Sequence, residues 1–236
     1  MLEISRVCMK FTKLQCRRQR KLVPDPAGAE RRTRPIEAVG ELPRLVANAW
    51  AVSEVDEDLF WTKVVRGELE VREKVTRQEK KQVVFILLDG SGSMKGKRHW
   101  KASGVIMHFL KAAAKGDCVV WLSVFDTRLS KVEKAETPEQ AKALIKKFLT
   151  GNYLGGGTDI GGSTKAAHAF LEKEIASGAA LWRPEVVVLT DEDTSFSGCK
   201  PADVRGTTVH SFAMEVANPG LVKWAQSCGG LGFDKF

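Results

Sequence analysis

The chain has few cysteines and no long apolar run. Its five cysteines are an odd number and none of them form a Cys-x-x-Cys motif, so we expect reduced thiols in a cytoplasmic protein. No apolar run approaches the length of a membrane span, and the N-terminal residues lack the uninterrupted apolar core of a signal peptide. These absences argue against a secreted or membrane-embedded protein.

Motifs for nucleotide hydrolysis, nucleophilic catalysis and zinc binding are also missing. Gly90 and Gly96 are separated by five residues where a phosphate-binding loop needs four, and Arg98 stands where that loop has a hydroxyl. No Gly-x-Ser-x-Gly motif occurs, and the four histidines lack the spacing of a triad or of a zinc site. We therefore expect no enzymatic activity. A metal-dependent hydrolase is a minor alternative, because no general base is evident.

Positive charge is concentrated at one end of the chain. Residues 1–35 hold ten lysines and arginines against three acidic residues, and they account for most of the net charge of +8. We interpret residues 1–40, which contain three prolines and no sustained periodicity, as a basic and flexible arm. Such an arm could anchor a nucleic acid, and a nucleic-acid-associated protein is the alternative functional prediction.

Strands and helices alternate from residue 82 onward, which predicts an α/β fold with a doubly wound, mostly parallel central sheet flanked by helices. Residues 41–81 combine helical spacing with an alternating edge-strand pattern, and we expect them to pack on the domain formed by residues 82–236. Strands are expected at 83–88, 118–125, 129–132, 185–190 and 207–213, and helices at 100–115, 137–148, 160–175 and 219–227.

Carboxylates and hydroxyls follow three different segments of this predicted sheet. Asp89, Ser91 and Ser93 come directly after the apolar run 83–88, Thr158 follows a glycine-rich loop, and Asp191 follows the strand 185–190. The carboxyl ends of parallel strands lie at one edge of a sheet, so these side chains can meet there. Two carboxylates and three hydroxyls suit octahedral Mg²⁺, with Mn²⁺ or Ca²⁺ as alternatives. Taken singly, each residue could instead be a helix cap or a turn former.

The pattern resembles the von Willebrand factor A (VWA) domain and its metal-ion-dependent adhesion site (MIDAS). The resemblance covers about residues 82–236 and includes Asp89-Gly90-Ser91-Gly92-Ser93, Gly155-Gly156-Gly157-Thr158-Asp159 and Leu189-Thr190-Asp191. It implies that Ser91, Ser93 and Thr158 bind the cation directly, and that Asp89 and Asp191 bind it directly or through water. It further implies a non-enzymatic module that captures an acidic residue of a partner protein.

The segment before the central strand indicates which group of VWA proteins the chain resembles. Residues 58–69 are similar to the lead-in of bacterial CoxE/ViaA-type proteins, which act with MoxR-type AAA+ ATPases in complex remodelling or metal-centre maturation. The resemblance implies an adaptor for such an ATPase. A helix and edge strand that only stabilise the sheet are the simpler interpretation of the same residues.

Overall fold

A computed structural model describes the chain except for residues 1–13, 15, 17, 150–156, 179–180 and 193–197. The described residues divide into two compact units, one formed by Arg20–Glu79 and the other by Lys80–Phe236 with the residues that precede Arg20. Within the described residues, no helix is both long enough and apolar enough to cross a membrane.

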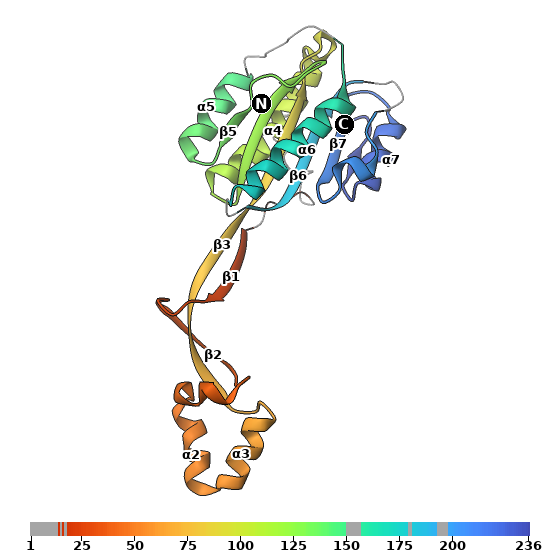
Figure 1. Ribbon diagram of the computed structural model, residues 1–236. Coiled ribbons are helices and arrows are strands. Elements are labelled where there is room, and N and C mark those ends of the chain that lie inside the picture. The colour runs from red at the N-terminus through yellow and green to blue at the C-terminus, as the bar shows by residue number, and fades with distance from the viewer. Residues whose placement is uncertain (1–13, 15, 17, 150–156, 179–180, 193–197) are drawn as a thin grey trace. The chain divides into compact units, whose positions relative to one another are not determined.

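The larger unit is built on a mixed sheet with the strand order β5-β4-β3-β6-β7-β8 (Figure 1). All neighbouring strands in this series are parallel except β4 and β5, which are antiparallel. The predicted mostly parallel α/β sheet is therefore confirmed. The strands are β3 (Glu70–Asp89), β4 (Cys118–Phe125), β5 (Glu133–Ala135), β6 (Leu181–Thr190), β7 (Thr208–Ala213) and β8 (Gly232–Phe233).

Helices cover both faces of this sheet. Alternate residues of a strand point to opposite faces, so the unbroken apolar run of β3 supplies two cores. Ile86 and its even-numbered neighbours pack with α4 (Lys97–Ala114) and α5 (Pro138–Leu149). Phe85 and its odd-numbered neighbours pack with α6 (Ile160–Ala176) and α7 (Pro219–Ser227). This arrangement is the doubly wound fold that the sequence predicts.

Several strands differ from their predicted bounds, and β6 begins at Leu181 instead of at residue 185. The edge strand expected near residue 70 and the central strand at 83–88 are one continuous strand, β3. The alternating residues at its beginning pair with β2, whereas the apolar residues at its end lie between β4 and β6. The short strand expected at 129–132 is only an isolated bridge from Phe125 to Leu129, and the strand itself, β5, begins at Glu133.

The smaller unit contains strands and helices of its own. β1 (Arg18–Pro24) and β2 (Glu30–Pro35) both pair with β3, and β2 does so in antiparallel register. A 3-10 helix at Val39–Arg44 leads to α2 (Ala47–Val55) and α3 (Glu57–Val65). Asp56 caps α3, because its side chain accepts a hydrogen bond from the backbone N of Leu59 at 2.9 Å.

This unit changes the interpretation of the N-terminal region. Where the sequence predicts a flexible arm over residues 1–40, the described residues 18–24 and 30–35 form two strands, because their backbones pair with β3. Most of residues 1–17 lie outside the described residues. The unit has a small core in which Phe60, Val64 and Val71 are buried. The packing of residues 41–81 on the domain stays a prediction.

Candidate metal centre

Two of the candidate ligands lie at the carboxyl ends of neighbouring strands. β3 ends at Asp89 and β6 ends at Thr190, and these strands pair in parallel with Leu88 opposite Leu189. Asp191 therefore follows β6 beside the loop that follows β3. The sheet brings together two carboxylates that are far apart in the sequence, as expected for the edge of a parallel sheet.

Asp89 is held by hydrogen bonds in a buried position. Its carboxylate accepts from the backbone N of Ser91 at 2.9 Å and from the hydroxyl of Thr190 at 2.6 Å. The residue is only 2% exposed. Burial raises the pKa of Asp89 above its ordinary value, and these hydrogen bonds partly oppose the rise. A nearby positive charge would stabilise the ionised form of this carboxyl group.

The serine hydroxyls connect the loop to Asp191. The hydroxyls of Ser91 and Ser93 lie 2.9 Å apart. Both donate to Oδ1 of Asp191, Ser93 at 3.0 Å and Ser91 at 3.5 Å. Asp89, Ser91, Ser93 and Asp191 thus form one cluster of oxygen atoms.

Thr158 is the fifth candidate, and it has a different environment. It is half-buried and lies two residues before α6. The backbone N of the next residue, Asp159, donates to the carbonyl of Asp126 after β4 at 2.8 Å. In the described part of the chain, no hydrogen bond links Thr158 to the other four residues. Most of the preceding glycine-rich loop, residues 150–156, lies outside the described residues.

Arg98 also belongs to this cluster, and sequence reasoning did not assign it a role there. It stands in the first turn of α4, and its guanidinium donates to Oδ2 of Asp191 and to the carbonyl of Ser93, the latter at 3.1 Å. A cation at a helix N-terminus is disfavoured by the helix dipole, so its position was a signal that a carboxylate partner lies nearby. Thr190 was missed as well, although it directly precedes Asp191.

The donor set of the cluster fits a hard divalent cation. Two carboxylates and two hydroxyls offer only oxygen atoms, which Mg²⁺ prefers, and Mg²⁺ usually keeps several water ligands. Arg98 balances only one of the two carboxylate charges. No cluster of three or more His, Cys, Asp and Glu side chains suited to a metal occurs among the described residues.

The four histidines contact other parts of the fold. A ring nitrogen of His99 lies 2.8 Å from the carbonyl of Phe148, and one of His108 lies 3.0 Å from the carbonyl of Leu14. His168 pairs with the hydroxyl of Thr207, and His210 accepts from the backbone N of Leu231. None of these contacts involves the cluster around Asp191.

The comparisons with known proteins concern the same part of the chain. Residues 84–194 match the family model described as von Willebrand factor type A domain. No curated protein matches the chain.

Solved structures also match. One is an aerotolerance-related membrane protein from Bacteroides fragilis NCTC 9343, with 16% identity and a TM-score of 0.48 over 65% of this chain and 90% of that chain. Another is the pilus adhesin SpaC from Lactobacillus rhamnosus GG, with 16% identity and a TM-score of 0.42 over 58% of this chain and 24% of that chain.

A third is the ArnB paralog VWA2 from Sulfolobus acidocaldarius, with 13% identity and a TM-score of 0.40 over 65% of this chain and 41% of that chain.

The family match begins inside β3 and extends past Asp191, so it includes four strands of the sheet and all five candidate ligands. Over residues 84–194, this chain is similar to von Willebrand factor type A domains.

Proposed function

We propose that this chain is a Mg²⁺-dependent, non-enzymatic protein-interaction module. Asp89, Ser91, Ser93 and Asp191 would hold the cation, and Thr158 would complete the set. The observation that carries the proposal is the cluster in which the hydroxyls of Ser91 and Ser93 both donate to Asp191, beside the buried Asp89. The family match over residues 84–194 supports it, since VWA domains are commonly interaction modules.

The donor set favours binding over turnover. Neutral hydroxyl ligands leave much of the cation's positive charge uncompensated, so an anionic oxygen is the preferred additional ligand. A bound cation would therefore supply an attractive site for an aspartate or glutamate of a partner. Hydrolysis would need a positioned general base, and the four histidines all contact other parts of the fold.

A MoxR-type AAA+ ATPase is our proposed partner, with the chain acting as its adaptor in complex remodelling or metal-centre maturation. The resemblance of residues 58–69 to CoxE/ViaA-type proteins motivates this choice. These residues include most of α3, on which Leu59 and Trp61 are each 44% exposed and Val65 is 86% exposed. Trp61 and Val65 are four residues apart and so lie on one face of the helix, and exposed apolar side chains on one face are typical of a contact surface.

Cation binding is tested by titrating the full chain with MgCl₂ in a calorimeter. Ser91→Ala should weaken binding at least about tenfold, because it removes a ligand oxygen and the hydroxyl that contacts Asp191. Ser177→Ala is the matched control, since Ser177 is exposed and its hydroxyl donates to the carbonyl of Glu174 at the end of α6. Equal affinities in the wild type and Ser91→Ala would contradict the proposed centre.

Partner capture is tested with a purified MoxR-type ATPase from the same genome. The wild type should retain the ATPase in Mg²⁺ and release it in EDTA, whereas Ser91→Ala should not retain it. Capture that is unaffected by both EDTA and the substitution would refute a cation-mediated contact. Absence of any capture would refute the choice of partner.

A further inference from the structure

We propose that the smaller unit contains a binding site for an organic phosphate such as a nucleotide. The site is a cavity of about 480 Å³ that β2, the beginning of β3 and the 3-10 helix line. Four basic side chains line it: Arg31, Arg44, Arg72 and Lys74. This site is independent of the candidate metal centre and of its proposed function.

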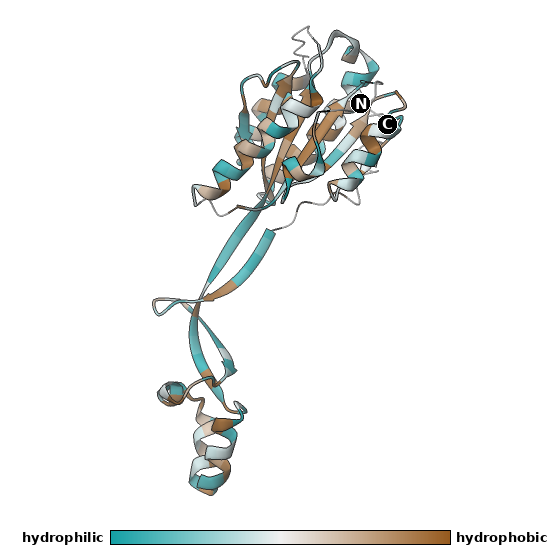
Figure 2. Ribbon diagram, turned by 45° about the vertical axis from the view of Figure 1, so that its right-hand side comes forward, coloured by the Kyte–Doolittle hydropathy of each residue, from teal (hydrophilic) through white to brown (hydrophobic). Residues whose placement is uncertain are grey.

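The strand register places three of these cations on one face of a two-stranded ribbon. β2 and β3 are antiparallel, with Arg31 opposite Lys74 and Thr33 opposite Arg72. Directly opposed residues in such a pair project on the same side, as do alternate residues along a strand. Arg44, at the end of the 3-10 helix, adds the fourth charge. Figure 2 shows that β2 and the beginning of β3 are mostly hydrophilic.

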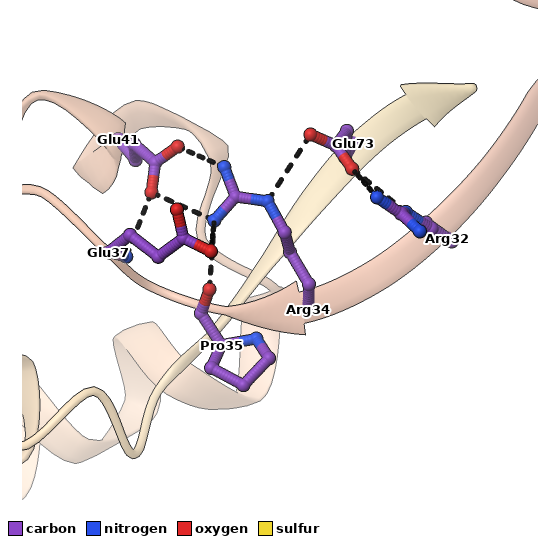
Figure 3. A network of polar contacts seen from close by, with 6 residues as sticks. All are labelled: Arg32, Arg34, Pro35, Glu37, Glu41 and Glu73. Atoms are coloured by element: carbon purple, nitrogen blue, oxygen red, sulfur yellow. Dashed lines mark hydrogen bonds and ion pairs between the residues drawn. The ribbon is translucent and has the colours of Figure 1, made fainter. Parts of the chain in front are cut away.

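The opposite face of the ribbon provides a contrast, because its charges are paired. Arg34 lies between Glu41 and Glu73, and Arg32 bonds to the other oxygen of Glu73 (Figure 3). These contacts lower the pKa of Glu73, first through its hydrogen bond to Arg32. Arg31, Arg44, Arg72 and Lys74, by comparison, form no ion pair with any residue that the structure describes.

The two carboxylates at the cavity are already engaged. Glu73 is held by Arg32 and Arg34. Asp25 accepts from the hydroxyl of Thr76 at 2.6 Å and from the backbone N of Ala27 at 2.9 Å. Four cations thus line a cavity whose two acidic residues have other partners, and the cavity has an excess of positive charge.

The chemistry of the lining favours a phosphate that carries an apolar group. Arginine guanidinium groups bind phosphate oxygens through two parallel hydrogen bonds, and three of the four cations are arginines. Pro24, Pro26 and Pro43 add apolar surface to the same cavity. A flat base or another apolar group could lie against these rings while the phosphates bind the arginines. The cavity volume also suits a small ligand.

The test titrates the full chain with ADP and, separately, with pyrophosphate, in EDTA and at low salt. We expect both to bind, with ADP the tighter because its base adds apolar contact. Arg72→Gln and Arg44→Gln should each weaken binding at least about tenfold, because each loses a charge-assisted hydrogen bond. EDTA removes divalent cations, so the outcome does not depend on the candidate metal centre.

Arg77→Gln is the matched control. Arg77 is on the same strand, but it projects to the other side and pairs with Glu30 at 3.2 Å. This variant should bind ADP like the wild type. The proposal would be wrong if neither ADP nor pyrophosphate bound, or if Arg77→Gln weakened binding as much as Arg72→Gln.

Discussion

At the scale of single residues, Asp191 is shared between two serine hydroxyls and one guanidinium. Oδ1 accepts from Ser91 and Ser93, and Oδ2 accepts from Arg98. A metal cation bound to the Asp191 carboxylate must compete with the guanidinium of Arg98 for the negative charge of that carboxylate. Arg98 is therefore expected to tune the affinity of the proposed centre without serving as a ligand.

Arg98→Ala should bind Mg²⁺ more tightly than the wild type, by several-fold. The reason is that Asp191 loses its intramolecular counter-ion and offers its full charge to the metal. Calorimetric titration with MgCl₂ measures the change.

Lys97→Ala is the control for this prediction. Lys97 precedes Arg98 on α4, but it pairs with Glu215 at 3.6 Å instead of Asp191. Lys97→Ala should change the affinity for Mg²⁺ much less than Arg98→Ala does. Weaker Mg²⁺ binding in Arg98→Ala would show that the guanidinium supports the centre instead of competing with the cation.

At the scale of elements, the ion pairs between β2 and its neighbours stabilise the smaller unit. The hydrogen bond from Arg34 is the largest cause that lowers the pKa of Glu41 from 4.5 to about 2. A carboxylate whose pKa is lowered in the folded state adds stability above its unfolded pKa. This stability is lost as the pH falls from about 4.5 to about 2.

Hydrogen exchange of the β2 amides, corrected for the intrinsic pH dependence of exchange, measures this effect. In the wild type, protection should decrease as the pH falls through this window. Arg34→Gln should lower protection at pH 7 and reduce the decrease in acid, because Glu41 and Glu73 lose a shared partner. Arg31→Gln, on the same strand without an ion pair to any described residue, should respond to acid like the wild type.

The connection from α7 to β8 contains a glycine, Gly230, that packs directly against the backbone of β7. A Cβ atom at Gly230 would lie 1.7 Å from the carbonyl oxygen of Val209 on β7. The backbone N of Gly230 bonds to the carbonyl of Ala225, which closes the end of α7 at this point. No side chain can fit there unless the backbone shifts.

Gly230→Ala should therefore lower the free energy of unfolding by about 1–3 kcal/mol or more. Urea denaturation measures the change. Gly40→Ala is the control, since nothing lies within 4 Å of the added methyl group. Equal stability of the two variants would mean that the chain can relax around Gly230.

At the scale of the whole molecule, cation binding and folding are linked. A ligand that binds only the folded state stabilises it by about 2.7 kcal/mol at a hundred times its dissociation constant. For a protein of this size, that corresponds to a rise in melting temperature of about 5–10 °C.

MgCl₂ should therefore raise the melting temperature of the wild type, and EDTA should reverse the rise. Ser93→Ala should show a clearly smaller rise in MgCl₂, because the loss of a ligand hydroxyl weakens cation binding. Differential scanning calorimetry gives the measurement. An equal Mg²⁺-dependent rise in Ser93→Ala would count against Ser93 as a ligand.

Much of the fold followed from local patterns. The apolar run 83–88 predicted a strand covered on both faces. In the structure β3 lies between β4 and β6, with α4 and α5 packed on one face of the sheet and α6 and α7 on the other. The helix at 137–148 also followed from its sequence, because Thr137 and Pro138 are typical of a helix start. The continuity of β3 did not follow, since its two halves have different periodicities and different partners.

The candidate centre was predictable in its residues but not in its contacts. Asp89, Ser91, Ser93 and Asp191 were chosen because they follow strands, and the sheet brings these four together. That these four residues and Thr158 bind a metal stays a prediction. The position of Arg98 at a helix N-terminus indicates that it has an acidic partner, but that partner is Asp191, almost a hundred residues away, and no local pattern identifies it.

The sequence by itself determined that strands and helices alternate along the chain from residue 82 onward, the class of sheet and the oxygen-rich residues at its edge. These features depend on the periodicity and identity of neighbouring residues. Only the tertiary structure decided that Arg98 shares Asp191, and that Arg31, Arg72 and Lys74 face one cavity while Arg32 and Arg34 are paired on the other side. These features depend on strand order and register, which arise from contacts between segments that are distant in the chain.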